Sequence, residues 1–359
     1  MRRKAYEEVS LVVDGTLHDG ESGSLCGGQE QTTDEGGAES DNGGYKIAFS
    51  NSYVGNAWRT AAVNIFDAYT ADLVEQGVLS KAYSSSADDD VQAQINEIRN
   101  MMSEGYDAIV CIAASATGLQ SVLEEAEERG IVVVCFDTTV DSDLVYNVNT
   151  DQFEYGRLLA QSLADRMGGE GNILWIKGIE GNRVTLDRTE GMQSVLDNYP
   201  GIKVLGDGYG KWDDSTTASV MSNLMSAYAS QGIDGILSEG GGGHAIVQSL
   251  VENGIDPATV PISEGEMFNS FMKDWVEMDL DAFCTAQPPY LAAAAVDVAL
   301  KVLNGEEVEP MTYVDLPTCS SKEEAEEKWY QPDQEGGFVC DWTDNNNTWN
   351  LTIEDVAPN

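Results

Sequence analysis

From residue 45 onward, short apolar runs alternate with segments of helical periodicity. An apolar run of four to eight residues bounded by turn formers is typical of a buried parallel strand. Segments in which apolar residues recur every three or four positions are typical of amphipathic helices. The predicted strands are 46–49, 79–84, 108–112, 132–136, 144–148, 172–176, 203–209, 235–237, 260–263 and 282–286. The clearest predicted helices are 91–103, 118–129, 154–167 and 216–230.

This alternation predicts an α/β protein with parallel sheets covered by helices on both faces. Ten predicted strands exceed what one small sheet holds, so we expect two doubly wound lobes. Residues 314–359 differ: they combine an acidic helix at 322–329 with loop and strand-like pieces. We expect this tail to pack across the lobes.

The stretch 45–61 reads as a strand, a polar loop and the start of a helix. Polar loops at the carboxyl ends of parallel strands are where open α/β sheets bind ligands. This loop region carries Asn51, Tyr53, Trp58 and Arg59. Aromatic faces beside planar hydrogen-bonding groups suit a sugar, which offers C–H faces and hydroxyls. Trp58 is equally consistent with a core position on the helix.

The net charge of the chain limits the classes of ligand that it can bind. Among 359 residues, 62 are acidic and 19 basic, for a net charge of −43. Such a chain repels the phosphates of nucleic acids and anionic membrane surfaces, so neither is expected as a ligand. An acidic, solvated surface fits a salty, extracellular or acid-tolerant setting.

Cysteine and histidine usage argues against metal and nucleophilic chemistry. None of the six cysteines forms a CxxC pair, and His18 and His244 are the only histidines. No cofactor motif or nucleophile–base set is visible, so we expect no metal, no cofactor and no enzymatic activity. Cys319 and Cys340 flank a short polar segment, which suggests a disulfide and an oxidising compartment.

The first 44 residues have the composition of a disordered tether. From Gly27 to Gly44 the chain is rich in Gly, Glu, Asp, Ser and Thr. Cys26 precedes this stretch and resembles the lipid-modified cysteine of bacterial surface lipoproteins, although Leu25 replaces the usual small residue and no apolar leader precedes it. We expect an extracytoplasmic protein, lipid-anchored at the cell surface or periplasmic.

Several segments, in order, resemble one protein family. They are IAFSNSYVGNAWRTA, GYDAIVCIAASATGLQSVLEEAEERGIVVVCFD, GIEGNRVTLDRTEGMQSVL and FCTAQPPYLAAAAVDVALKVLNGE. Together they resemble the type I periplasmic binding proteins of the ribose, galactose and galactofuranose group, the substrate-binding subunits of ABC sugar importers. The resemblance covers about residues 45–306. It implies an N-terminal lobe of 45–138 and 288–313, a C-terminal lobe of 139–287, and a three-strand hinge near Thr138, Gly265 and Pro288.

The resemblance also implies a set of sugar contacts. In the first lobe, Asn51, Trp58 and Arg59 would line the cleft, and Asp137 matches the acid that ends the fourth strand and accepts from sugar hydroxyls. Thr138 stands where the family often has Arg. The implied contacts of the second lobe are Asp187, Arg188, Trp212, Asp213 and Gln287.

Two positions depart from the family pattern. Glu239, in SEGGGG, stands where an Asn-Asp pair is usual, and Glu264-Gly265 replaces Asp-Gly. Each glutamate could substitute for the family residue. Other interpretations of these residues stay open. Asp187 and Arg188 could be exposed helix residues, and Trp212 could be a packed edge aromatic. The glycine run could be a turn or a phosphate cradle.

Together these features predict a ligand trap. Two lobes would close on a monosaccharide-like sugar, and the closed protein, expected to be a monomer, would deliver it to an ABC permease. The alternative is a receptor subunit that presents a sugar or autoinducer to a signalling system. A LacI-type regulator shares the fold, but the acidic leader cannot supply its DNA-binding helices.

Overall fold

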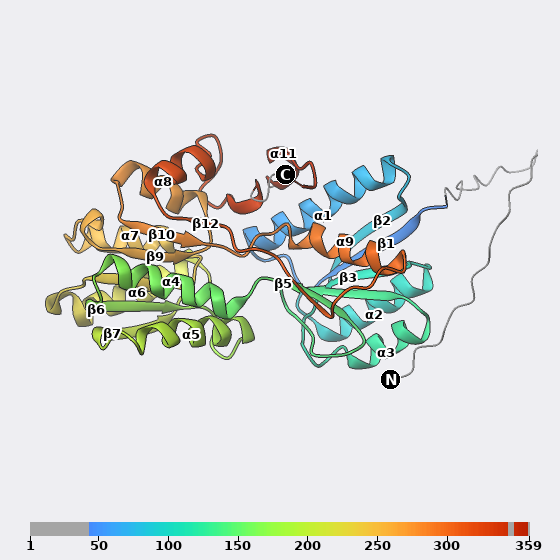
Figure 1. Cartoon of the computed structure of the whole chain (residues 1–359), viewed down its shortest axis with the longest axis horizontal. Helices are drawn as coiled ribbons and strands as arrows, with labels where there is room; N and C mark the ends of the chain where they lie inside the picture. The colour runs from blue at the N-terminus through green and yellow to red at the C-terminus, as the bar shows by residue number, and fades with distance from the viewer. Residues whose placement is uncertain (1–42, 344–347, 358–359) are drawn as a thin grey trace, which may run out of the picture. The chain divides into compact units, whose positions relative to one another are not determined.

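The computed structural model describes residues 43–343 and 348–357, which contain two sheets (Figure 1). The first sheet has six parallel strands. From edge to edge they are β2 (Leu79–Ser86), β1 (Tyr45–Asn51), β3 (Ala108–Ile112), β4 (Val132–Phe136), β5 (Tyr146–Asn149) and β11 (Met311–Tyr313).

The second sheet also has six strands, and only its last edge strand runs antiparallel. The order is β7 (Gly201–Tyr209), β6 (Glu170–Lys177), β8 (Gly235–Ser238), β9 (Ile262–Gly265), β10 (Ala282–Thr285) and β12 (Thr318–Cys319). The predicted fold class, two doubly wound parallel lobes, is confirmed.

Helices cover both faces of each sheet because successive strand residues point to opposite sides. In β1, Ile47 and Phe49 pack on the side of α1 (Ala57–Glu75) and α9 (Leu291–Leu303), and Ala48 packs on the side of α2 (Val91–Ser103) and α3 (Gln120–Glu128). The second sheet packs α4 (Gln152–Arg166) and α5 (Arg183–Leu196) on one face. Its other face packs α6 (Asp214–Tyr228), α7 (Gly243–Glu252) and α8 (Asn269–Met278).

Polar side chains fix where several helices begin. Asn56, Asp90 and Asp151 accept hydrogen bonds from the first-turn N–H groups of α1, α2 and α4, at 2.8–2.9 Å. These caps satisfy N–H groups that have no partner inside the helix. They hold the strand-to-helix loops at the carboxyl ends of the strands.

The predicted hinge is wrong at two of its three points, Thr138 and Gly265. β5 hydrogen-bonds to β4, so it belongs to the first sheet, and the chain crosses to the second lobe after Asn149 rather than near Thr138. Gly265 ends β9 inside the second sheet and is not a crossing. The other two crossings are 286–290 and 314–317. Sequence periodicity identifies a strand but not the sheet that it joins, which explains the error.

The tail binds elements of both sheets. Cys340 N donates to Met267 O at 2.8 Å, and Asn269 N donates to Phe338 O at 2.9 Å, both beside α8. On the first-lobe side, Trp349 Nε1 donates to Asp297 Oδ2 of α9 at 2.8 Å. The tail contains α10 (Lys322–Glu324), η3 (Ala325–Trp329), η4 (Asp341–Thr343) and α11 (Ile353–Val356).

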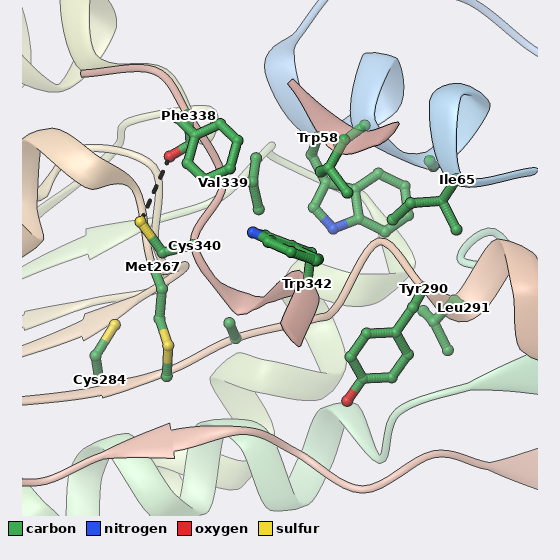
Figure 2. Close-up of a cluster of buried hydrophobic side chains, with 14 of the residues drawn as sticks. Trp58, Ile65, Met267, Cys284, Tyr290, Leu291, Phe338, Val339, Cys340 and Trp342 are labelled. Atoms are coloured by element: carbon green, nitrogen blue, oxygen red, sulfur yellow. Dashed lines mark hydrogen bonds between the residues drawn. The ribbon is translucent and has the colours of Figure 1, made fainter. Parts of the chain in front are cut away.

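Figure 2 shows Trp342 of the tail in the middle of a buried cluster. Met267 lies on one side of it, and Trp58 and Tyr290 lie on the other. One apolar core is therefore continuous from α1 through the tail to the second sheet.

The structure corrects the predicted disulfide. Cys319 and Cys340 are both free thiols. Cys319 lies on β12 directly opposite Cys284 of β10, whereas Cys340 Sγ lies 3.5 Å from Asn269 Oδ1. The two thiols therefore contact different partners. Cys26, the candidate lipidation site, lies outside the described residues.

Within 43–343 and 348–357, no helix is both long enough and apolar enough to span a membrane.

Candidate functional site: a cavity between the lobes

A cavity of about 350 Å³ lies at the carboxyl ends of the strands, with walls from both lobes. This is where parallel sheets collect their functional loops. Residues from the first lobe that line it include Tyr53, Trp58, Arg59 and Asp137. From the second lobe and the 286–290 crossing it is lined by Arg188, Trp212, Glu266 and Gln287, among others.

The first-lobe wall is built on an ion pair. Arg59 Nη2 lies 2.9 Å from Asp137 Oδ2, and both side chains are largely buried. Asp137 directly follows β4 and has a positive φ of 59°. Arg59 Nη1 also donates to Asn51 Oδ1 at 3.1 Å and to Ser52 Oγ at 3.0 Å. The guanidinium is thereby fixed on three sides.

Asn51 supports the wall rather than forming it. Its side chain is fully buried at the end of β1 and does not line the cavity. Its Nδ2 donates to Tyr53 O at 2.8 Å while its Oδ1 holds Arg59. The predicted direct ligand contact therefore becomes a positioning role for Arg59.

The second-lobe wall has its own buried pair. Arg188 Nη1 lies 3.3 Å from Glu266 Oε1, and the guanidinium lies 3.6 Å above the ring of Tyr155. Arg188 also donates to Gln152 Oε1 and to Glu239 O, each at 2.8 Å. Burial raises the pKa of Glu266, and the nearby Arg188 charge opposes that shift.

Gln287 joins the two walls. Its Nε2 donates to Asp137 Oδ1 of the first lobe, while its Oε1 accepts from Arg188 Nη2 of the second lobe at 3.4 Å. Trp58 Nε1 donates to Gln287 O at 2.6 Å. A single hydrogen-bonded network therefore runs from Arg59 to Glu266 through the crossing segment.

The two tryptophans differ in their surroundings. Trp58 belongs mostly to the buried cluster of Figure 2 and reaches the cavity with part of its ring. Trp212 is half-buried and lies against Gly178, where an added Cβ would be 2.5 Å from the indole. Among the described residues, Trp212 Nε1 has no hydrogen-bond partner. The Nε1 atom is itself buried, so Trp212 offers the cavity its ring face and not a donor.

The charges on the cavity wall balance. Three basic side chains, Arg59, Arg188 and Lys211, face three acidic ones, Asp89, Asp137 and Glu266. This balance contrasts with the net charge of −43 for the whole chain. A wall of paired donors and acceptors suits a neutral, hydroxyl-rich molecule.

Besides Asn51, four residues expected in the cleft do not line this cavity: Asp187, Glu239, Glu264 and Asp213, which caps α6 and lines a neighbouring cavity. Asp187 forms an ion pair with Arg183 at 2.8 Å on the surface of α5, because neighbouring helical residues face different directions. Glu239 accepts from Gly178 N and Thr189 Oγ1, each at 2.9 Å, beneath the loop. Glu264 lines a neighbouring cavity.

Burial shifts the acidity of the two glutamates that replace family residues. It raises the pKa of Glu239 to about 7 and that of Glu264 to about 8. Hydrogen bonds from Gly178 to Glu239 and from Gly242 to Glu264 oppose the shifts only in part.

Glu266, the acid that faces Arg188, was not predicted from the sequence. It stands two residues after Glu264 in SEGEM, and a positive φ of 71° turns it toward the cavity. No pattern in the sequence separates the two glutamates. The other wall residues not foreseen are Ser52, Asn56, Asp89, Ala113, Ala114, Ile179, Asn182, Val184, Lys211 and Phe268.

No group of three or more His, Cys, Asp or Glu side chains among the described residues is placed to hold a metal ion. The site is therefore a polar, partly aromatic binding cavity built from side chains of two lobes.

Comparison with known proteins places the chain in a family. Residues 47–307 match the model described as the periplasmic binding protein domain. A xylitol-binding protein from Mycolicibacterium smegmatis is 31% identical over 47% of this chain and 49% of its own length. A multiple sugar-binding periplasmic receptor from Rhizobium radiobacter is 30% identical over 42% of this chain and 48% of its own. The chain thus spans about half the length of the curated relatives that it matches.

Solved structures share the fold at low sequence identity. An ABC transporter solute-binding protein from Thermobispora bispora superposes with a TM-score of 0.70 at 21% identity, covering 80% of this chain and 89% of that one. The periplasmic binding protein component of the arabinose ABC transporter from Shewanella sp. ANA-3 gives a TM-score of 0.69 at 24% identity, covering 78% and 93%. The chain therefore belongs to the periplasmic binding protein family, in its type I sugar-binding group.

Proposed function

We propose that this chain is an extracytoplasmic solute-binding protein that traps one neutral, monosaccharide-like sugar in the interlobe cavity. The proposal rests on two ion pairs, Arg59–Asp137 and Arg188–Glu266, which lie on opposite walls of the cavity. Gln287 hydrogen-bonds to both. Each pair offers donors and acceptors side by side, which is what a vicinal diol requires. Trp212 adds a ring face for the sugar's C–H groups.

Binding would be coupled to lobe closure. A sugar that first touches Arg59 and Asp137 gains further contacts when Arg188, Glu266 and Trp212 reach it. The closed state is favoured by the difference between the sugar's affinities for the closed and open states. No bond is made or broken in this mechanism, and it requires no cofactor.

We further propose that the closed monomer delivers its sugar to an ABC permease. Support comes from the family and from the Shewanella neighbour, which is named as part of an arabinose ABC transporter. Extracytoplasmic location fits the family, and lipid attachment at Cys26 stays a proposal. A sensory receptor role uses the same cavity. It would be favoured over transport if deletion of the gene abolished a sugar-induced response but left sugar uptake unchanged.

A thermal-shift screen of the purified chain tests sugar binding. Mono- and disaccharides, polyols and autoinducer-2 are compared by the unfolding temperature. A ligand at a hundred times its Kd stabilises the folded state by about 2.7 kcal/mol, a shift of a few degrees for a protein of this size. We expect a hit among neutral sugars that is lost in Trp212→Ala and retained in the exposed control Asp143→Asn. A chain free of ligand by native mass spectrometry that shifts with no sugar would refute the proposal.

A further inference from the structure

Gln152 lies behind the cavity wall, at the point where the chain enters the second lobe. It is the first residue of α4, directly after the crossing that follows β5. Its side chain is 7% exposed and does not line the interlobe cavity. A buried glutamine amide has one acceptor and two donors, and each needs a partner. The partners of Gln152 connect two of the lobe crossings to the wall of the site.

Arg188 determines which way the amide of Gln152 is turned. Its Nε donates to Gln152 Oε1 at 2.8 Å. Because a guanidinium has donors only, the atom that faces it must be the amide oxygen, and the other end of the amide is the NH2 group. That group donates to Asn149 Oδ1 and Thr150 Oγ1, each at 3.0 Å, and to Gln287 Oε1. The amide of Gln152 therefore has one orientation that satisfies its neighbours.

The orientation of Gln152 in turn sets that of Gln287. Gln287 Oε1 accepts from Gln152 Nε2 and, at 3.4 Å, from Arg188 Nη2. This leaves the NH2 group of Gln287 to donate to Asp137 Oδ1. The reversed amide would bring its oxygen against the Asp137 carboxylate and its NH2 group against two donors, so it would form none of these bonds.

The acceptors that Asp137 offers to a ligand depend on this bridge. One of its oxygens faces Gln287 Nε2 and the other faces Arg59 Nη2, and further lone pairs remain for sugar hydroxyls. A reversed Gln287 amide would put two acceptors in contact and leave both without a donor, which costs free energy. Gln152 thus acts on both walls of the cavity, on Arg188 directly and on Asp137 through Gln287.

We propose that Gln152 is a positioning residue for ligand binding, which orients the Gln287 amide and the Arg188 guanidinium so that the two walls present matched donors and acceptors to one sugar. This proposal rests on the proposed function, because Gln152 acts only through side chains of that site. Its role is to select an orientation rather than to fill space, so the donor end of its amide matters more than its size.

Two substitutions separate orientation from packing. Gln152→Glu keeps the shape of the side chain and an acceptor for Arg188 Nε, but it turns a carboxylate oxygen toward Gln287 Oε1 and favours the reversed amide. Gln152→Met is similar in size and removes both hydrogen bonds, while Arg188 Nη2 still orients Gln287. We expect the sugar Kd to rise about tenfold in Gln152→Met and about a hundredfold in Gln152→Glu. A packing role predicts the opposite order, because glutamate is the closer replacement for glutamine.

Calorimetric titration of the full chain, stripped of ligand, measures these constants. The probe is the tightest binder to the wild type among glucose, galactose, ribose, xylose and arabinose. Gln92→Glu and Gln92→Met make the same changes at an exposed position in the first turn of α2 and should alter the Kd less than about twofold.

Two results would overturn the positioning role but leave sugar binding intact. One is a Kd in Gln152→Met within about twofold of the wild type, and the other is a smaller loss in Gln152→Glu than in Gln152→Met. If only one of the two variants folds, a Kd within about twofold of the wild type in that variant overturns the role. Failure of the wild type to bind any of the five sugars would overturn the proposed function and this role with it.

Discussion

Two aspartates allow a matched comparison, because Asp137 lines the cavity and Asp187 lies on the surface of α5. Asp137 faces the cavity and pairs with Arg59, whereas Asp187 pairs with Arg183 outside it. Removing one charged hydrogen-bonding group costs about 1.5–3 kcal/mol of binding. Asp137→Asn should therefore weaken the sugar by about 10- to 100-fold, and Asp187→Asn by less than twofold, both measured by calorimetry. Equal losses in the two variants would contradict the placement of the site.

Glu264 should make stability depend on pH. Burial raises the pKa of its native carboxyl to about 8, whereas the unfolded chain titrates near 4.5. Between these values the native state keeps a proton that the unfolded chain has released. The free energy of unfolding therefore falls as pH rises from about 4.5 to about 8, by up to about 1.4 kcal/mol per pH unit for this group.

Glu264→Gln removes this titration, so its stability should fall less steeply across that range than that of the wild type. Urea unfolding at pH 5, 6, 7 and 8 measures the slope for each protein. Glu252→Gln, at an exposed position on α7, serves as the control and should keep the wild-type slope. Parallel slopes for the wild type and Glu264→Gln would show that the carboxyl is ionised throughout.

At the scale of elements, long buried strands could be predicted from the sequence, and short edge strands could not. The predicted strands 108–112 and 132–136 match β3 and β4 residue for residue, because Val, Ile and Cys in a continuous apolar run fit a strand buried on both faces. β11 and β12, with three and two residues, carry too few side chains to show a period.

In the candidate site, too, some residues could be predicted from the sequence and others could not. Asp137 directly follows β4 and Arg59 lies in the first turn of α1, and the resemblance implied cleft positions for both, where they line the cavity. Glu266 could not be chosen over Glu264, because the choice depends on a backbone turn with positive φ. The role of Gln287 as a bridge depends on both lobes at once, which no local pattern contains.

The free thiols of β12 and the tail predict that reductant has no effect. Cys319 and Cys340 are both buried and unpaired as a disulfide. Loss of a native disulfide typically costs 2–5 kcal/mol, so a bridged protein would unfold several degrees lower in reductant. We expect the unfolding temperature with and without a phosphine reductant to agree within about one degree. A clear drop would show that some of these thiols form a disulfide and would contradict the structure.

At the scale of the whole molecule, salt should raise the unfolding temperature but leave the sugar affinity of the cavity nearly unchanged. A net charge of −43 destabilises the compact state by self-repulsion, which salt screens over a Debye length of about 10 Å at 0.1 M. The unfolding temperature should therefore rise between 0.05 and 0.5 M NaCl. The sugar affinity should change less than about threefold, because the cavity wall is charge-balanced and the ligand neutral. Glycine betaine at equal osmolality, which is not a sugar, controls for solute effects, and an affinity that falls tenfold with salt would point to a charged ligand.

The central claim is that the interlobe cavity binds one neutral sugar. Calorimetric titration of ligand-stripped, full-length protein with the best neutral sugar and with its uronic acid tests this most directly. We predict one sugar per chain with a Kd in the micromolar range or tighter, and a uronate at least tenfold weaker. Preferred binding of the uronate, or no heat with any neutral sugar, would contradict the account.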